Sequence, residues 1–539
     1  MHPRTASKLS ILASGAWDNK PIDYNNDDDG DLTTYDGEST DHFTQHHQIK
    51  KYNISLLPEK NLLTIFSYLT LQELLRCSLV CRQWRSLSQN SRLWKRVYLR
   101  PEYNGLHISN VNKFITMISK RFSLALQYID LPIELITIDI LHELANKCPN
   151  LNRLTLDFST AMQLHDFNEL NIFPCNLKML CICLSDVIFL EGFMRKIYSF
   201  LSSLETLHII GTIEKSTDPE EEIYETINIS KIKLHTPNLR VINLYGIYFI
   251  DDYHIEAIAS GCIHLECLAL NFCTRIKGTS FVNVIQRCRK LKCLLLQNTG
   301  IEDSPMCSVA WESSYLSELD ISSTELTEEC LLDIFFRMPK LNYLAVPNCD
   351  GFTDKVLEIL IHHGKLSTCR AIDLSNTVNL DYEIVFTFLT KHGRHLQGIA
   401  YAGAANVTEE FWRNIIKSLK NIKIMIMGSP YGMFKKITTK VHVDQILDAC
   451  AQYCSKLERL EIQWDPDTVR YSDYSSKFID HLRTRCTYLQ SLVLSDGAYY
   501  EVVKANFERA ERNTVVRTTT MYRTSNVSLL HYYNELRFN

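Results

Sequence analysis

Apolar residues recur along this chain in the pattern Leu-x-x-Leu-x-Leu, in which isoleucine, valine, tyrosine or methionine can replace a leucine. The pattern occurs fourteen times, and most occurrences are 25 to 28 residues apart. They begin at Leu126, Leu151, Leu177, Leu204, Leu239, Leu265, Leu291, Leu316, Leu341, Cys369, Leu396, Ile422, Leu457 and Leu489. The intervals after Leu204, Ile422 and Leu457 are longer, which indicates insertions or longer helices. A fixed period of this length is typical of a repeat architecture.

Each repeat combines a strand pattern with a helix pattern. The two-residue step from Leu294 to Leu296 places both side chains on one face of a strand. Helical steps of three and four residues lie between the strands: Ile255, Ile258 and Ala259; Phe281, Val284 and Ile285; Phe411, Ile415, Ile416 and Leu419. One strand–helix unit cannot bury its own apolar face, so the units must stack. The pattern therefore predicts an α/β fold, a curved leucine-rich-repeat solenoid (a horseshoe) over residues 101–498.

A different pattern precedes the repeats, in residues 51–100. The spacing of Leu62, Phe66 and Leu69 predicts one short helix, and the apolar residues of 74–80 predict a second. Leu57-Pro58 suits the start of the first helix, because proline fixes φ and lacks a backbone N–H. A segment of about 45 residues is near the lower size limit for independent folding. Its two tryptophans indicate that part of its apolar surface binds another chain.

This segment resembles the F-box family. The matching motifs are Leu57-Pro58, Ile65-Phe66-Ser67-Tyr68-Leu69, the run from Leu74 to Trp84, and Leu93-Trp94. Lys60 stands where the family commonly has an acidic residue, and Asn61 stands where leucine is common. F-box domains bind a Skp-type adaptor protein, and both differences are expected to weaken the contact with it slightly. The alternative interpretation is a helical hairpin that caps the following domain.

Several cysteines follow the repeat period. Five of them precede the first residue of a repeat by three positions: Cys148, Cys262, Cys288, Cys454 and Cys486. Cys273 and Cys349 each follow an inward strand residue by three positions, where a buried side chain is expected to satisfy turn backbone. This arrangement resembles the cysteine-containing class of leucine-rich repeats. Together with the F-box motif, it resembles the F-box/leucine-rich-repeat family.

The resemblance implies a substrate-recognition subunit of a Skp–cullin–F-box ubiquitin ligase. The F-box would dock on a Skp-type adaptor, which is carried by a cullin bearing a RING subunit, and the repeats would hold a target protein for ubiquitination and proteasomal degradation. The expected adaptor-binding residues are Leu57, Pro58, Ile65, Phe66, Leu69, Leu74, Val80, Cys81, Trp84, Leu93 and Trp94. The alternative is a non-catalytic scaffold that binds or sequesters a partner without promoting its turnover.

The strand positions that alternate with the inward leucines are expected to face the concave side of the solenoid. Mixed polar and aromatic residues there suit recognition of a protein segment. The candidate target-binding residues are Arg153, His208, Tyr245, Asn271, Gln297, Glu318, Asp320, Tyr343, Arg459 and Glu461. Ordinary strand surface in contact with solvent is the alternative for each of them.

Composition narrows the classes of partner and the cellular locations that fit this chain. Residues 1–50 are predicted to be a disordered acidic tail, since residues 18–42 carry nine carboxylates and one lysine. The net charge of −5 does not favour nucleic acid as a partner, and no apolar run approaches the ~20 residues that span a membrane. The chain starts without the apolar core of a signal peptide, so we expect a cytoplasmic or nuclear protein with reduced cysteines. Residues 499–539 are expected to form a terminal cap or tail.

Motifs for catalysis are missing from the sequence. There is no Cys-x-x-Cys pair for a zinc site, no glycine-rich phosphate loop, and no Gly-x-Ser-x-Gly or His-Glu-x-x-His. The cysteines that follow the repeat period have a place in the core. We therefore predict no catalytic residue, no metal and no cofactor, and a function in binding.

Overall fold

The computed structural model describes residues 54, 57–100, 106, 108, 110–185, 187–212, 224–404, 407–429, 440–495, 497–507 and 515–518. The chain forms two compact units. The amino-terminal unit runs to residue 158 and includes 165–177, and the carboxy-terminal unit contains 159–164 and the residues from 178 onward. The predicted acidic tail, 1–50, and much of the predicted terminal segment, 499–539, lie outside the described residues.

The amino-terminal unit starts with three short helices and continues into a parallel sheet. Its elements are α2 (Glu59–Phe66), α3 (Leu71–Cys77), α4 (Arg82–Ser88), η3 (Ser91–Trp94), β1 (Arg96–Val97), α5 (Val111–Met117), η5 (Ile118–Phe122), η6 (Ser123–Ala125), β2 (Tyr128–Pro132), η7 (Ile133–Leu135), α6 (Ile138–Lys147) and β3 (Arg153–Asp157). Arg96 of β1 aligns with Tyr128 of β2, and Tyr128 aligns with Arg153 of β3. The sheet of the first repeats therefore extends into the predicted F-box segment.

Two buried contacts join the F-box helices to the first repeats. The indole Nε1 of Trp94 donates to Ser88 O at 2.8 Å, and its ring centroid lies 5.8 Å from that of Phe122. Arg100, which is 1% exposed, pairs with Asp130 at 3.1 Å and with Asp157 at 3.2 Å. The compact unit that contains the F-box helices therefore continues past residue 100.

The carboxy-terminal unit alternates strands and helices. Its strands are β4 (Met179–Cys183), β5 (Thr206–Ile210), β6 (Val241–Tyr245), β7 (Cys267–Ala269), β8 (Cys293–Leu295), β9 (Glu318–Asp320), β10 (Tyr343–Ala345), β11 (Ala371–Asp373), β12 (Gly398–Ala402), β13 (Ile424–Gly428), β14 (Val441–His442), β15 (Arg459–Ile462), β16 (Val469–Arg470), β17 (Ser491–Leu494) and β18 (Val515–Thr518). Its α-helices are α7 (Glu191–Ile197), α8 (Ile229–His235), α9 (Asp252–Gly261), α10 (Phe281–Arg287), α11 (Asp303–Cys307), α12 (Glu328–Arg337), α13 (Asp354–His362), α14 (Tyr382–His392), α15 (Glu409–Ile416), α16 (Val443–Tyr453), α17 (Ser475–Arg485) and α18 (Ala498–Phe507).

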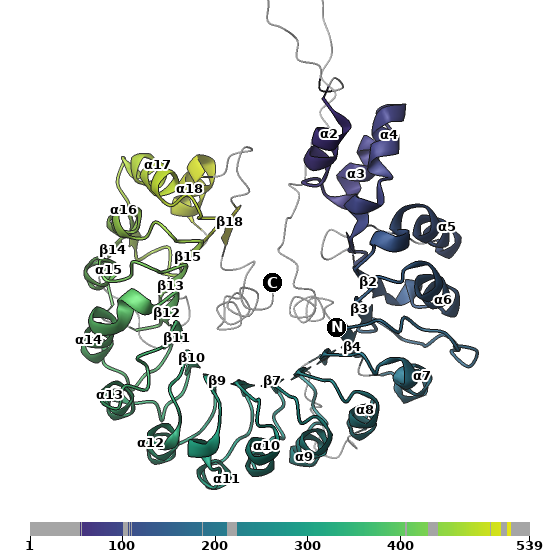
Figure 1. Ribbon diagram of the computed structural model, residues 1–539. Helices are drawn as coiled ribbons and strands as arrows, with labels where there is room; N and C mark the ends of the chain where they lie inside the picture. The colour runs from purple at the N-terminus through teal and green to yellow at the C-terminus, as the bar shows by residue number, and fades with distance from the viewer. Residues whose placement is uncertain are drawn as a thin grey trace, which may run out of the picture. The chain divides into compact units, whose positions relative to one another are not determined.

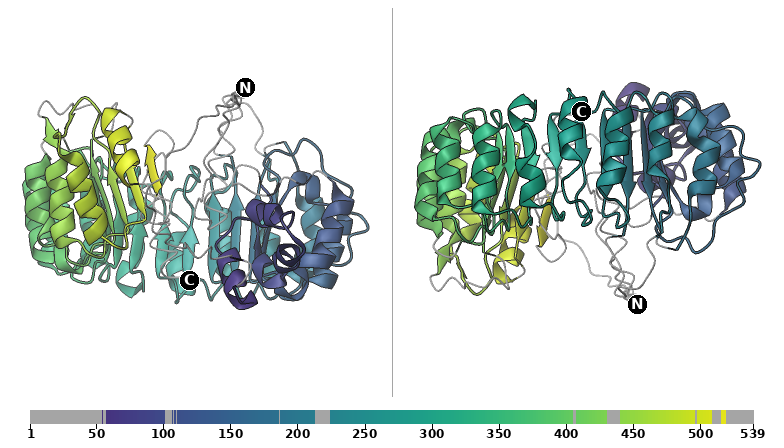
Figure 2. Two further views of the ribbon diagram at one scale, coloured as in Figure 1. Left: turned by 90° about the horizontal axis from the view of Figure 1, so that it is seen from above. Right: turned by 90° about the horizontal axis from the view of Figure 1, so that it is seen from below.

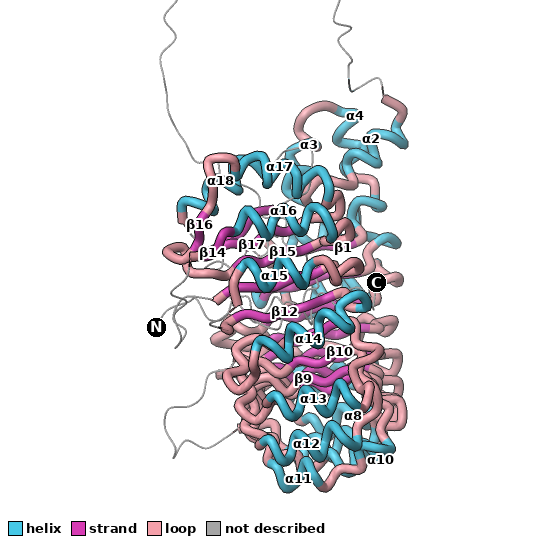
Figure 3. The backbone as a smooth tube through the Cα atoms, turned by 90° about the vertical axis from the view of Figure 1, so that its left-hand side faces the viewer, coloured by secondary structure: helices cyan, strands magenta, loops and turns pink. Residues whose placement is uncertain are grey.

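Within this unit the strands line the inner side of an arc and the helices line the outer side (Figure 1). The two views in Figure 2 show strands and helices as separate layers, and Figure 3 shows helices α11 to α17 stacked in sequence order. The paired strands are parallel, and β14 pairs with β16 in a separate two-stranded sheet. These two short strands lie in the long intervals after Ile422 and Leu457. The curvature predicted for the repeats is thus seen within this unit.

The predicted repeat positions are confirmed strand by strand. Each of the fourteen predicted positions is followed, two residues later, by the start of a strand. The inward positions align across strands, as in Leu268, Leu294 and Leu319, and the predicted helix stripes are buried. Among the described residues, no helix combines the length and the apolar character needed to cross a membrane.

The turn that follows the strand is the same in five consecutive repeats. A residue with φ between 53° and 64° ends each turn: Phe272, Asn298, Ser323, Asn348 and Asn376. The next residue is Cys273, Thr299, Thr324, Cys349 or Thr377, and its side chain donates to a backbone carbonyl near the end of a strand. The Sγ atoms of the two cysteines do so at 2.8 Å. This confirms the predicted role of the two cysteines and shows that threonine fills the same place.

Candidate functional site

The helices of the F-box segment are fixed by local caps. Pro58 precedes α2 with φ −53°. Thr70 Oγ1 accepts from Glu73 N at 3.3 Å, while Glu73 Oε2 accepts from Thr70 N at 2.8 Å. This capping box sets the start of α3. Cys81 Sγ accepts from Trp84 N at 3.4 Å and caps α4, so this exposed thiol has a structural role.

A small closed core holds these helices together. It consists of Leu62, Phe66, Leu74 and Leu87, and Trp84 packs against it. The rings of Phe66 and Trp84 meet edge to face, with centroids 5.3 Å apart and planes 80° apart. The four core side chains are each at most 3% exposed. The segment therefore has an interior of its own.

A set of apolar side chains remains outside this core. Six large apolar residues are exposed between residues 54 and 80, more than in any other described stretch of that length. These residues, the exposed F-box set, are Ile54, Leu57, Ile65, Tyr68, Leu79 and Val80. Tyr68 is 78% exposed, Leu79 77% and Val80 65%. Single exposed apolar residues are ordinary on a protein surface, but this density indicates a binding surface.

The structure separates the eleven predicted adaptor-binding residues into three groups. Leu57, Pro58, Ile65, Val80 and Cys81 are exposed, and Leu69, Trp84 and Leu93 are half-buried. Phe66, Leu74 and Trp94 are buried, which corrects their prediction as contact residues. Phe66 and Leu74 form the F-box core, and Trp94 packs on Phe122 of the first repeat region.

Sequence reasoning missed Tyr68 and Leu79. Leu79 and Val80 were expected on the second helix, but α3 ends at Cys77 and both lie in the turn before α4. In each case a serine ends the helix (Ser67 for α2 and Ser78 for α3) and the next apolar residue is exposed. This serine–apolar pair is the signal that could have found them.

The exposed F-box set lies in a basic segment. Residues 57–100 contain eight lysines and arginines and two glutamates, a net charge of +6 within a chain of net charge −5. All of the basic residues except Arg100 are exposed. Such a surface favours a partner with acidic groups around an apolar contact.

The predicted target-binding positions are less accessible than expected. In one register row Cys293, Glu318 and Tyr343 are neighbours, and in the next row Leu295, Asp320 and Ala345 are neighbours. Side chains on strands about 4.8 Å apart touch one another. The apolar side chains of these rows form a buried cluster, and Glu318 and Asp320 are buried with them. The prediction of an exposed surface is therefore wrong for Tyr245, Asn271, Gln297, Glu318, Asp320, Tyr343 and Glu461, which are buried. Arg153 is exposed, and His208 and Arg459 are half-buried.

Burial raises the pKa of two carboxyl groups on this face above the ordinary value. Burial raises the pKa of Asp320 to about 6 and that of Asp373 to about 7. Ser322 N donates to Asp320 at 2.9 Å and Ser375 N donates to Asp373 at 3.0 Å, which opposes the shifts. The charge of Asp320 raises the pKa of Asp373 further. Each group is thus costly to ionise where it stands.

Exposed aromatic residues gather on three loops that lead from a strand to a helix and on the first turn of α9. Phe189, Tyr224, Tyr248 and Tyr253, which we call the aromatic edge, are exposed in three consecutive repeats. The rings of Phe189 and Tyr224 are 5.9 Å apart. An open hollow of about 610 Å³ is lined by Tyr248, Asp251, Asp252, Tyr253, Thr274, Arg275 and Lys277. Aromatic side chains next to a hollow suit a protein contact.

A buried histidine fixes the aromatic edge. His254 Nδ1 lies 2.7 Å from Asp251 Oδ1 and His254 Nε2 lies 3.0 Å from Glu225 Oε1. Burial pushes the pKa of Asp251 upward, but the hydrogen bond and charge of His254 together bring it below its ordinary value. The histidine thereby ties the loop before α8 to the start of α9.

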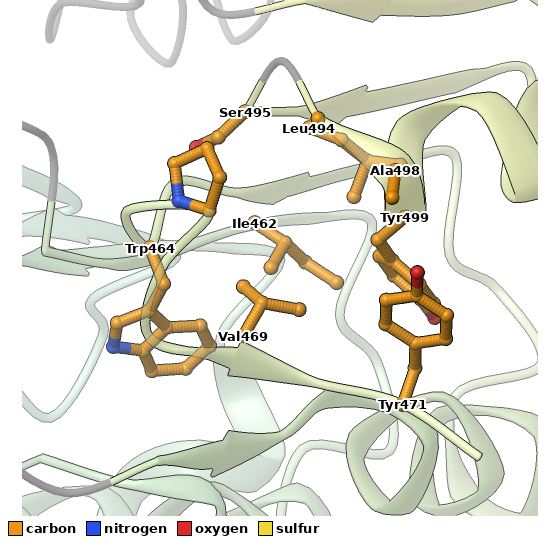
Figure 4. Close-up of a pocket in the computed structure, with 10 residues that line it drawn as sticks. Ile462, Trp464, Val469, Tyr471, Leu494, Ser495, Ala498 and Tyr499 are labelled. Atoms are coloured by element: carbon orange, nitrogen blue, oxygen red, sulfur yellow. The ribbon is translucent and has the colours of Figure 1, made fainter.

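A small cavity lies near the end of the carboxy-terminal unit (Figure 4). Its volume is about 60 Å³, and its walls include Ile462, Trp464, Val469, Leu494 and Tyr499. The Tyr499 hydroxyl donates to Asp444 at 3.4 Å, so this wall is anchored. Pockets for drug-sized ligands start at about 300 Å³, and this cavity is much smaller. In the part of the chain that the structure describes, no three histidine, cysteine, aspartate or glutamate residues form a group that could hold a metal.

Comparisons with known proteins agree with the F-box assignment. A family model described as F-box-like matches residues 54–100, which confirms the predicted F-box. The BTB/POZ domain-containing protein FBL11 of Arabidopsis thaliana is 33% identical over 108 residues, which are 19% of this chain and 11% of that protein. The chain thus covers about a ninth of this relative.

Two solved structures match this chain at low similarity. The crystal structure of the Rad7 and Elc1 complex in yeast contains a chain with 14% identity and a TM-score of 0.41, matched over 76% of this chain and 89% of that one. The leucine-rich repeat-containing protein LegL7 from Legionella pneumophila has 14% identity and a TM-score of 0.31, matched over 72% of this chain and 97% of that one.

Proposed function

We propose that this protein is the target-recognition subunit of a Skp–cullin–F-box ubiquitin ligase. The exposed F-box set carries the proposal, because it belongs to an F-box-like domain whose core is closed without it. Full burial of one such side chain contributes about 1.5–3 kcal/mol. Covering several of them with a Skp-type adaptor therefore supplies enough free energy for stable binding, and the +6 charge of the segment favours an acidic adaptor surface.

In this proposal the chain contributes position rather than chemistry. The cullin and the RING subunit reach it through the adaptor, and the conjugating enzyme carries the activated ubiquitin. The chain holds target lysines near that ubiquitin and so raises their effective concentration. Degradation of the target by the proteasome follows from the ubiquitin chain.

We assign target binding to the carboxy-terminal unit and, within it, to the aromatic edge. The row of strand positions around Tyr343 is buried, whereas Phe189, Tyr224 and Tyr253 are each more than half exposed. Aromatic side chains are enriched among the residues that dominate binding free energy at protein interfaces. Arg275 and Lys277, at the adjoining hollow, add polar partners.

Reconstitution with purified adaptor, cullin and RING subunit tests the proposal. The variant Leu79→Ser, Val80→Ser removes two members of the exposed F-box set. Leu124→Ser is the matched control, because Leu124 is 65% exposed in the same unit but lies outside the F-box. We expect the double variant to lose the adaptor and the control to keep it. Equal recovery of the adaptor by both variants would contradict the proposal.

The same preparation separates a ligase subunit from a scaffold. Once a target has been captured, its ubiquitination by the assembled complex is measured with the wild type and with the double variant. A ligase subunit requires transfer that is lost in the double variant. A scaffold binds the adaptor and target without any transfer.

A further inference from the structure

The outer layer of the carboxy-terminal unit contains two cysteines in direct contact. Cys307 is the last residue of α11, and Cys330 lies in the first turn of α12. Their Sγ atoms are 3.4 Å apart. A disulfide bond requires about 2.0 Å, so the sulfur atoms must approach by only about 1.4 Å. Both residues are free thiols in the structure.

The two helices are tied together on both sides of this contact. Asp303, at the start of α11, accepts from Thr327 Oγ1 at 2.6 Å and from Thr327 N at 3.1 Å. Arg337 of α12 donates to Cys307 O and to Val309 O, each at 2.7 Å. These bonds hold the backbones of the two repeats, so the short distance between the sulfur atoms is set by the fold.

The two thiols differ in access to solvent. Cys307 is half-buried, whereas Cys330 is 2% exposed. Burial raises the pKa of the Cys330 thiol, and the neighbouring Cys307 raises it further. A soluble oxidant therefore reacts with Cys307 first, and Cys330 is the thiol placed to attack the oxidised Cys307 sulfur. The Cys330 Sγ also donates to Asp303 O at 3.8 Å, and the buried cysteines Cys273 and Cys349 donate to backbone carbonyls.

We propose that Cys307 and Cys330 are a redox modification site, which hydrogen peroxide converts to a disulfide between neighbouring repeats. The Cys307 thiolate sulfur attacks one peroxide oxygen, the O–O bond breaks, and the leaving hydroxide takes a proton to become water. The Cys330 sulfur then attacks the resulting sulfenic sulfur. The S–S bond forms, the S–O bond breaks, and the released hydroxide takes the Cys330 proton. Two thiols and one peroxide thus give one disulfide and two waters.

The disulfide staples α11 to α12 and so makes this part of the outer layer more rigid. The closed loop spans the strand β9 between the two helices. A dithiol reductant reverses the change by thiol–disulfide exchange. The site is independent of the adaptor and target surfaces proposed above, so each proposal can fail without the other.

Peptide mapping of the full chain tests the site. The reduced protein is treated with hydrogen peroxide, free thiols are then blocked with N-ethylmaleimide under denaturing conditions, and the chain is digested with trypsin and Glu-C together. Cleavage after Glu302, Glu312, Glu329 and Arg337 yields the peptides 303–312 and 330–337, each with one cysteine. We expect these two peptides to appear as a linked pair that dithiothreitol separates.

Two variants make the outcome decisive. In Cys307→Ser the linked pair falls to background. Because Cys330 is buried in the folded protein, it escapes oxidation, and maleimide then blocks it fully under denaturing conditions. In Cys330→Ser the Cys307 sulfenic acid persists and reacts with dimedone. The oxidised wild type melts at a higher temperature than the reduced form, and Cys307→Ser shows no such shift. Overoxidation or a single adduct at Cys307, with Cys330 unlinked in the folded wild type, overturns the proposal.

Discussion

Replacing Asp373 with asparagine is expected to stabilise the carboxy-terminal unit, and to do so most at alkaline pH. Asp373 is 1% exposed, and burial raises its pKa to about 7 from an ordinary 3.8. Asparagine keeps an oxygen that can accept the 3.0 Å hydrogen bond from Ser375 N but carries no charge. The variant therefore removes the cost of ionising a buried group and leaves the turn intact.

The direction in which the stability of the wild type changes with pH follows from proton binding by Asp373. Between pH 4 and pH 7 the folded state keeps the Asp373 proton while the unfolded state has lost it. The folded state therefore binds more protons, and the stability of the wild type falls as pH rises through this window. Below pH 4 both states are protonated and the effect vanishes. The asparagine variant does not lose stability in this way, because its side chain does not ionise.

The size of this destabilisation follows from the difference between the pKa of Asp373 in the folded state and its ordinary pKa. About three units at 1.36 kcal/mol each give at most about 4 kcal/mol of destabilisation above pH 7. At pH 5.5 the same arithmetic gives about 2 kcal/mol. The advantage of the variant over the wild type is thus expected to grow by about 2 kcal/mol between pH 5.5 and pH 8.

Urea unfolding followed by tryptophan fluorescence measures this difference, since Trp311, Trp412 and Trp464 are buried in this unit. Asp350→Asn, at an exposed position, is the matched control and should show no growing advantage. A difference between Asp373→Asn and the wild type that is independent of pH would refute the reasoning. So would a wild type that is the more stable protein at pH 8.

Three further changes test other parts of the account. Arg100→Ala should destabilise the amino-terminal unit by about 3–5 kcal/mol in urea unfolding, because Asp130 and Asp157 lose their buried ion-pair partner. The control Arg96→Ala, at an exposed position, should change the free energy of unfolding little. Asp252→Ala should lower the melting temperature of the carboxy-terminal unit, because its carboxylate accepts four hydrogen bonds from the next repeat at 2.7 to 3.1 Å; an unchanged melting curve would show that this link is dispensable. The double variant Phe189→Ala, Tyr253→Ala should keep the melting temperature and adaptor binding but lose most target capture, and retained capture would move the target to another surface.

Period-based features of the fold could be predicted from the sequence. The strands start two residues after each predicted position because alternating leucines and a fixed period are local properties of the chain. The roles of Cys273 and Cys349 followed from the same spacing. The sequence also located the F-box, since its motif residues are close together along the chain.

Features that depend on neighbouring strands could not be predicted. Asp320 and Tyr343 have the pattern of surface strand residues, but their burial depends on the side chains of adjacent repeats that align with them. Trp94 matched a docking motif, yet it packs against Phe122, a contact that no local pattern shows. Leu79 was predicted within a helix because its spacing from Leu75 is helical, and the end of α3 at Cys77 was not predicted.

The most direct test of the central claim is a calorimetric titration of the full chain with a purified Skp-type adaptor. We expect saturable binding with a negative heat-capacity change, because apolar side chains of the exposed F-box set leave water. We also expect the affinity to weaken with added salt, because the segment carries a charge of +6. The Leu79→Ser, Val80→Ser variant should bind at least about tenfold more weakly, a loss of about 1.4 kcal/mol. Absence of binding by the wild type, or equal binding by the variant, would contradict the claim.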